Sequence, residues 1–301
     1  MDKLIFPSFL NAGDKIAIVS PSGRIDQPFL NGAVAQLSSW GFKPVLGEYA
    51  SDSSGHYAGT IEHRTEDFQM AMDDEGIKAI FCSRGGYGVV HILNKLDFMH
   101  FREHPKWLLG FSDITALHSL FQSKGYASVH SPMARHLTIE AENDPSVLFL
   151  KNLLFGQLPR YNCPSHTLNQ QGRSQGILRG GNFSVFYGLR GTPYDIPPEG
   201  TILFMEDVNE RPHVVERMMY NLKLGGMLEK LSGLIVGRFT EYEEDRSLGK
   251  DLYEALADLV KEYNYPVCFH FPVGHVTHNL PLITGAAVEL TVEENVTLTF
   301  A

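Results

Sequence analysis

The sequence predicts an α/β protein whose first half is a three-layer domain built on a parallel sheet. Short apolar runs alternate there with amphipathic segments, and the turns between them are short. Strand, helix, strand order with short turns implies parallel pairing and right-handed crossovers. Beyond a polar stretch, further apolar runs mix with two helical patterns, which indicates a second domain of strands and helices. In parallel sheets, functional groups gather at the carboxyl ends of the strands.

Each element of the first domain follows from its local pattern. The apolar run at residues 15–20 ends in the turn cluster Pro21-Ser22-Gly23, as expected of a buried strand. The next segment carries apolar positions at helical spacing and stops at Gly41. The same criteria predict strands at residues 15–20, 42–46, 77–82 and 106–111, and helices at residues 28–40, 64–73, 89–96 and 114–122.

The composition of the chain changes before its second half. From about Asn143 to Gln175 the chain is polar and rich in turn residues, which is typical of a linker. Apolar runs then predict strands at residues 176–178, 201–205, 233–237 and 287–292, with helices at residues 214–222 and 252–263. We therefore expect a first domain over residues 1–150, a linker over 151–175 and a second domain over 176–301.

Composition narrows the class of protein. The chain has 301 residues, 43% hydrophobic and 20% charged, as in a soluble globular protein. Its formal net charge of −10 argues against a nucleic-acid binder. The amino terminus has no basic patch followed by an apolar stretch, and no run approaches the roughly 18 apolar residues of a membrane span. We expect a cytoplasmic protein that binds neither nucleic acid nor membrane. The three widely spaced cysteines suit a reducing compartment.

Ser112 lies where a predicted strand turns directly into a predicted helix. A serine there projects its hydroxyl above the sheet edge, where the amides of the first helical turn and the helix dipole can stabilise an oxyanion. The Gly-x-Ser-x-Gly pattern of a nucleophile elbow is absent. Serine also commonly caps a helix before an apolar periodic run. Local sequence leaves both interpretations, nucleophile and helix cap, open.

A glycine-rich run, Ser-Arg-Gly-Gly-Tyr-Gly at residues 83–88, follows another predicted strand. Glycines let a backbone approach a ligand closely and leave its amides available to donate. The run lacks the Gly-Lys-Ser/Thr ending of a phosphate-binding loop and the Gly-x-Gly-x-x-Gly pattern of a dinucleotide-binding loop. Their absence weakens a dinucleotide-dependent enzyme as an interpretation. A plain tight turn is the alternative. Arg84 suggests anion binding, because a guanidinium matches a carboxylate in geometry.

Three acids end the strand at residues 201–205, among them Glu206 and Asp207. A carboxylate there could orient a histidine, although solvated surface acids are common at such positions. Spacing alone does not choose between Glu206 and Asp207.

Three histidines lie close together near the end of the chain, at His270, His275 and His278. No acidic or cysteine ligand is nearby, and their spacing matches no common zinc pattern, so we expect no metal. A histidine on a glycine-bounded loop is a better candidate for a general base.

Four motifs, at residues 83–88, 105–115, 203–207 and 272–275, together resemble the LD-carboxypeptidase family. These are the muramoyl-tetrapeptide carboxypeptidases, which share a superfamily with microcin-immunity peptidases. The resemblance extends from Gly13 to Gly285 and depends on all four motifs in order. It implies a flavodoxin-like N-terminal domain and a smaller, β-rich α+β C-terminal domain, with the active site between them.

The resemblance also assigns roles by position. Ser112 matches the nucleophile, Glu206 the acid and His275 the base of a catalytic triad. Backbone amides of Asp113 and Gly86 match the oxyanion hole. Catalysis of this kind needs no cofactor and no metal.

Arg84 is our candidate for binding the terminal carboxylate of the substrate, with bracing of its own loop as the alternative. No other residue is singled out for this role.

The implied function is that of a serine carboxypeptidase of peptidoglycan recycling. It would release terminal D-alanine from the L,D-bond of a muramyl tetrapeptide through an acyl-enzyme, with a peptidoglycan-derived muropeptide as substrate. A homodimer is expected, also from the resemblance.

Two alternatives remain. A peptidase of the microcin-immunity type would cleave an aminoacyl-nucleotide conjugate. That branch tends to carry an aromatic residue that stacks on the base, whereas Trp40 and Trp107 both lie in the first predicted domain. A non-catalytic ligand-binding protein on the same scaffold is the other, and the presence of all three triad residues argues against it.

Overall fold

The computed structural model describes residues 4–245 and 249–300 and divides the chain into two compact units. Unit 1 comprises Met1–Leu158 and Thr277–Thr284, and unit 2 comprises Pro159–Val276 and Gly285–Ala301. Over the described ranges, no helix is both long enough and apolar enough to cross a membrane.

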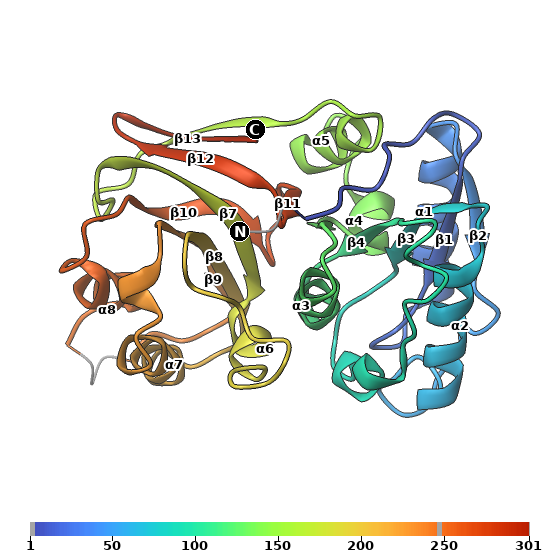
Figure 1. Cartoon of the computed structure of the whole chain (residues 1–301), viewed down its shortest axis with the longest axis horizontal. Helices are drawn as coiled ribbons and strands as arrows, with labels where there is room; N and C mark the ends of the chain where they lie inside the picture. The colour runs from blue at the N-terminus through green and yellow to red at the C-terminus, as the bar shows by residue number, and fades with distance from the viewer. Residues whose placement is uncertain (1–3, 246–248, 301) are drawn as a thin grey trace. The chain divides into compact units, whose positions relative to one another are not determined.

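Unit 1 is built on a six-stranded sheet with the strand order β11-β5-β4-β3-β1-β2 (Figure 1). The strands from β2 to β5 run parallel, and β11 pairs antiparallel with β5. The order 2-1-3-4-5 is that of flavodoxin-like sheets, so the expected fold of the first domain is confirmed. The strands are β1 Lys15–Val19, β2 Lys43–Leu46, β3 Ile77–Cys82, β4 Trp107–Gly110, β5 Ser128–His130 and β11 Leu282–Thr284.

Two pairs of helices complete the layers of unit 1. Helix α1 approaches α4 so closely that a Cβ built at Gly32 would meet Thr138, and α2 contacts α3 through the rings of Phe68 and Phe121. The helices are α1 Gln27–Ser39, α2 Ile61–Asp73, α3 Thr115–Ser123, α4 Ala134–Ile139 and α5 Pro145–Leu154, with short 3₁₀ helices η1 Val89–His91, η2 Leu93–Lys95 and η3 Ser112–Ile114.

One predicted helix of unit 1 is shorter and tighter than expected. The predicted helix at residues 89–96 forms only η1 and η2. β-Branched side chains are frequent here, at Val89, Val90 and Ile92, and they lose rotamer freedom in an α-helix.

Unit 2 contains a seven-stranded mixed sheet with the order β10-β9-β8-β7-β12-β13-β6. Strands β7 to β10 are parallel, whereas β12, β13 and β6 continue the sheet in antiparallel fashion. This mixed sheet confirms a β-rich second domain. The strands are β6 Arg160–Pro164, β7 Gly172–Asn182, β8 Thr201–Val208, β9 Gly233–Thr240, β10 Val267–Gly274, β12 Ala287–Val292 and β13 Asn295–Phe300.

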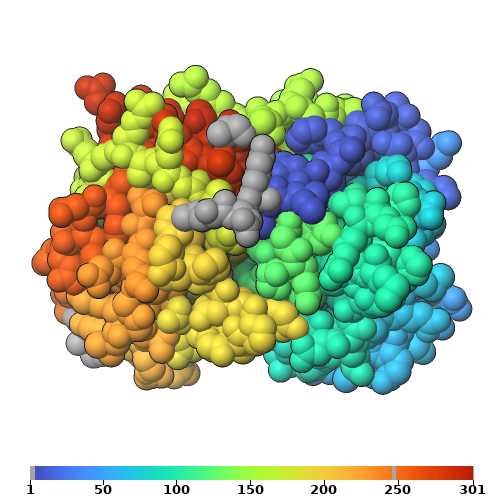
Figure 2. Space-filling model, viewed as in Figure 1, coloured from blue at the N-terminus to red at the C-terminus, as the bar shows by residue number. Residues whose placement is uncertain are grey.

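The helices of unit 2 pack against the parallel part of its sheet. They are α6 Phe183–Tyr187, α7 Pro212–Leu224, α8 Leu252–Val260 and the 3₁₀ helix η4 Leu228–Lys230. Met219 and Leu222 of α7, with Leu256 of α8, share one buried cluster with Leu203 and Leu234 of the sheet. The outer sides of these helices, yellow to orange in Figure 2, form part of the surface of unit 2.

The boundary of the units differs from the expected linker at residues 151–175. That stretch contains the end of α5, strand β6 and the first residues of β7, and the units divide at Leu158. Strand β6 exists because it pairs with β13, where Tyr161 lies opposite Leu298. Likewise, Thr277–Thr284 belongs to unit 1 because β11 pairs with β5. Pairing with distant strands leaves no trace in local composition.

Candidate active site

Ser112 has a left-handed backbone conformation, with φ of +63°. Residues other than glycine rarely adopt it, and strained residues of this kind cluster at functional sites. Ser112 follows β4 after a single residue and opens η3, which runs directly into α3. The N-cap residues of η3 and α3 are Phe111 and Ile114, so Ser112 does not stand at the capping position of either helix. The sharp strand-to-helix turn is the geometry of a nucleophile elbow.

The glycine loop at residues 83–88 lies directly against Ser112. A Cβ built at Gly85 would lie 2.6 Å from Cβ and 2.8 Å from Oγ of Ser112. Any side chain at Gly85 would therefore occupy the space of the hydroxyl. The next residue, Gly86, is exposed, and its amide donates no hydrogen bond in the part of the chain that the structure describes. An amide next to the serine is thus available to a ligand.

The side chain of Asp113 ties the Ser112 turn to its surroundings. Its carboxylate accepts hydrogen bonds from Ser22 Oγ at 2.5 Å and from the amide of Val89 at 3.0 Å. Burial raises the pKa of Asp113, and these two hydrogen bonds oppose the shift. The buried Arg64 donates to the carbonyl of Gly88 at 2.9 Å in the same region. Sequence reasoning considered only the amide of Asp113 and missed Arg64, which lies in a charged helical segment that resembles a solvated surface.

Arg84 is exposed at the edge of the glycine loop. Its Nη1 donates to the carbonyl of Arg24 at 2.6 Å, so the loop-bracing contact exists. Within residues 4–245 and 249–300 the guanidinium forms no ion pair with a carboxylate. Its remaining N–H groups can therefore also face an anionic ligand.

Glu206 and His275 form a hydrogen-bonded pair in unit 2. Nδ1 of His275 lies 2.7 Å from Oε2 of the fully buried Glu206, and the imidazole is 21% exposed. Gly274 allows this approach, because a Cβ there would lie 2.9 Å from Oε2. Since a carboxylate only accepts, Nδ1 carries the proton, and Nε2 has the lone pair that a general base needs.

The charge of Glu206 sets the basicity of His275. Burial of the imidazole lowers its pKa, but attraction to the Glu206 carboxylate and the hydrogen bond to it raise the pKa, and the raising effects prevail. The pKa of His275 therefore lies above the ordinary value of 6.5.

Asp207 has a different set of partners. Its carboxylate accepts hydrogen bonds from Asn182 Nδ2 at 2.9 Å and from the amide of Ser184 at 2.8 Å, at the start of α6. Burial and the neighbouring Glu206 raise the pKa of Asp207 to about 6. Of the two acids that spacing left open, Glu206 is the one that reaches a histidine.

The other two histidines of the C-terminal run are bound elsewhere. Nδ1 of His270 lies 3.3 Å from Arg238 Nη1, and burial together with that cation lowers the pKa of His270 to about 4. His278 lies in unit 1, with Nδ1 2.6 Å from Asp144 Oδ2. Among the described residues, no group of three or more His, Cys, Asp or Glu side chains is placed to hold a metal.

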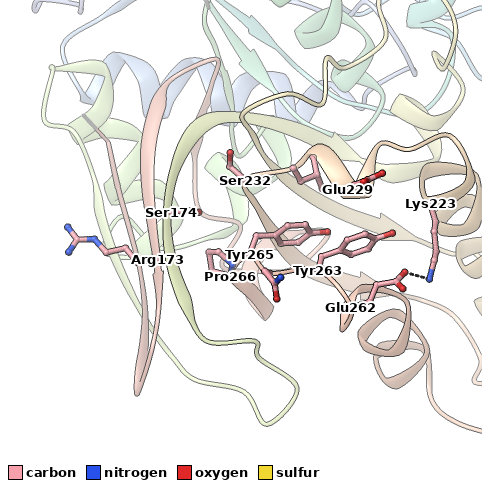
Figure 3. Close-up of a pocket in the computed structure, with 11 residues that line it drawn as sticks. Arg173, Ser174, Lys223, Glu229, Ser232, Glu262, Tyr263, Tyr265 and Pro266 are labelled. Carbon is pink, nitrogen blue, oxygen red and sulfur yellow. Dashed lines mark ion pairs between the residues drawn. The ribbon is translucent and has the colours of Figure 1, made fainter.

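A separate open cavity of about 750 Å³ lies in unit 2 (Figure 3). The rings of Tyr263 and Tyr265 run parallel in its wall, 5.6 Å apart, and Lys223 pairs with Glu262 at 2.6 Å. None of the predicted catalytic residues lines it. This cavity is not the candidate site.

The chain matches known proteins over most of its length. Residues 16–131 match the LD-carboxypeptidase N-terminal domain, and residues 175–290 match the LD-carboxypeptidase C-terminal domain. A probable murein peptide carboxypeptidase of Bacillus subtilis is 30% identical over 295 residues, which covers 96% of this chain and 92% of the relative. A murein tetrapeptide carboxypeptidase of Pseudomonas aeruginosa is 30% identical, with 88% and 89% covered.

Solved structures of other proteins have a similar fold. A muramoyltetrapeptide carboxypeptidase from Oxalobacter formigenes superposes with a TM-score of 0.88 at 26% identity and covers 95% of this chain and 98% of its own. The microcin C7 self-immunity protein MccF has a TM-score of 0.86 at 23% identity, with 98% of both chains covered, and at that identity shares the fold alone. Matched in both domains and in the same order, the chain belongs to the LD-carboxypeptidase family and is a serine carboxypeptidase of the hydrolase class.

Proposed function

We propose that the chain removes terminal D-alanine from murein tetrapeptides, using Ser112 as nucleophile with Glu206 and His275 as its acid and base. The observation that carries this proposal is the left-handed turn at Ser112, because a strained serine at a strand-to-helix junction suits attack rather than capping. The connectivity of the chain supports a site that uses residues of both units. Only Val276 separates His275 from Thr277, the first residue of the segment that belongs to unit 1.

The chemistry is that of an acyl-enzyme. Nε2 of His275 takes the hydroxyl proton as Ser112 Oγ bonds to the scissile carbonyl carbon. Glu206 stabilises the imidazolium. The imidazolium then gives its proton to the leaving nitrogen, the carbon–nitrogen bond breaks, and D-alanine departs. Water, deprotonated by the same imidazole, attacks the ester, and Ser112 recovers its proton.

Two backbone amides complete the proposed site. The amides of Gly86 and Asp113 would donate to the oxyanion, which stabilises the tetrahedral intermediate more than the ground state. Arg84 would bind the terminal carboxylate that defines a carboxypeptidase substrate. We further propose that the enzyme acts on muropeptides in the cytoplasm as a homodimer, as the family resemblance implies.

Replacing Ser112 by Ala should lower kcat by at least about 10³-fold, because the acyl-enzyme of the proposed mechanism forms on its hydroxyl. D-alanine release from a muramyl tetrapeptide is the measurement, with the melting temperature as a check on folding. Ser123→Ala, at the exposed end of α3, is the control and should retain activity. Turnover by the Ser112→Ala variant would exclude the nucleophile role.

The pH profile tests the Glu206–His275 pair. A general base acts as the neutral imidazole, so kcat/KM should rise with pH and level off above the raised pKa of His275. In Glu206→Gln the main raising charge is gone, so the inflection should move to lower pH while the plateau falls. An inflection that stays in place would show that another group titrates.

Arg84→Gln should raise KM for the tetrapeptide about tenfold or more, the loss expected for one charge-assisted hydrogen bond. A substrate ending in D-alaninamide, which has no carboxylate, should lose nothing further in this variant. Arg102→Gln, an exposed arginine elsewhere in unit 1, is the matched control. Equal losses on both substrates would indicate that Arg84 only braces the loop.

One comparison tests the substrate class. Wild-type enzyme is offered a muramyl tetrapeptide and a peptide–nucleotide conjugate in parallel assays. Release of D-alanine with no cleavage of the conjugate is expected. Cleavage of the conjugate alone would overturn the proposed substrate while leaving the catalytic residues in place.

A further inference from the structure

We infer that His118 is a positioning residue for the nucleophile, because its imidazole holds the carbonyl of Gly110 and thereby the strained turn at Ser112. This role presupposes the proposed function of Ser112. His118 lies in α3 and is fully buried. His118 lies outside the four sequence motifs at residues 83–88, 105–115, 203–207 and 272–275.

Three hydrogen bonds form a chain through His118. Nε2 lies 2.8 Å from the Gly110 carbonyl oxygen, and Nδ1 lies 2.8 Å from Ser128 Oγ. Ser128 Oγ lies 2.7 Å from Thr284 Oγ1. All of these groups belong to unit 1 and are fully buried, so water does not compete for them.

The direction of this chain is fixed by chemistry. A carbonyl oxygen only accepts, so Nε2 must carry the proton, and the neutral imidazole then has its lone pair on Nδ1. Ser128 therefore donates to Nδ1, and Thr284 donates to Ser128. Burial lowers the pKa of His118 to about 4, so the ring stays neutral and retains this single arrangement near neutral pH.

The carbonyl that His118 holds lies two residues before the nucleophile. Gly110 ends β4, and after Phe111 the backbone enters the left-handed conformation of Ser112. Such a conformation is unfavourable for a residue other than glycine and persists only when surrounding contacts enforce it. The amide of Ser131 also donates to Gly110, at 3.0 Å, so this carbonyl is held from two sides. A turn released here would displace Ser112 Oγ from the oxyanion amides.

The two ring nitrogens can be tested separately with matched amide replacements. The amide of Gln reaches the position of Nε2, so His118→Gln retains a donor to Gly110. The amide of Asn reaches only the position of Nδ1, so His118→Asn retains the Ser128 contact and loses the Gly110 contact. A merely structural histidine would tolerate or reject both changes alike.

We expect His118→Asn to lower kcat about tenfold or more with KM unchanged, since small misplacements of a reacting group are costly. His118→Gln should stay within about threefold of wild type. The rate at which a fluorophosphonate labels Ser112 should fall in parallel with kcat. His100→Asn, an exposed histidine of the same unit, is the control.

Equal rates in the Asn and Gln variants would overturn the role of His118. If His118→Asn does not fold, Ser128→Ala decides, because the imidazole then loses the hydrogen bond at Nδ1 that orients the ring. The Nε2–H hydrogen bond to Gly110, followed by ¹⁵N NMR, should weaken, and labelling of Ser112 should slow. An unchanged Nε2–H signal together with an unchanged labelling rate in that variant would likewise overturn the role of His118. Wild-type protein that fluorophosphonate does not label would instead contradict the proposed function of Ser112.

Discussion

The left-handed backbone at Ser112 is the constraint around which its neighbours in unit 1 are arranged. A strained residue is kept only where neighbouring groups leave it no alternative, and here they surround it. Gly85 leaves room for the hydroxyl, and Asp113 binds the Ser22 and Val89 segments on either side. The contacts that enforce the strain are also the contacts that would aim the oxyanion amides. The folded structure and the proposed function thus require the same conformation of this turn.

The segment Thr277–Thr284 belongs to unit 1, although the chain on either side of it belongs to unit 2. After His275 the chain leaves unit 2, adds β11 to the edge of the unit 1 sheet, and returns to unit 2 at Gly285. In β11, Thr284 begins the hydrogen-bond chain that ends at the carbonyl of Gly110, two residues before Ser112. Asn279, on the same segment, contacts the buried His130 at 3.1 Å. The segment that follows the proposed base is therefore built into the unit that carries the proposed nucleophile.

Sequence patterns were sufficient for the elements whose partners are local. Apolar periodicity and turn residues within each segment predict strands β1, β3, β8 and β9 and helices α1, α3 and α7. The same patterns do not predict strands β6 and β11, since these exist through pairing with the distant strands β13 and β5. The same distinction holds at the site. Ser112 and the glycine loop stand out in sequence, whereas Arg64 and His118 matter only because folding buries them beside particular carbonyls.

The Glu206–His275 pair serves two purposes that conflict in their dependence on pH. Because the folded pKa of His275 is raised, the attraction between imidazolium and carboxylate stabilises unit 2 fully below about pH 6.5 and is lost as the pH rises through the raised value. The proposed base, however, must be neutral to accept the proton of Ser112. In the proposed mechanism the resting enzyme would therefore be active in the range where this pair contributes least to stability. The full attraction would return only when His275 takes the proton, so Glu206 would favour the charged state created during catalysis over the state that binds substrate.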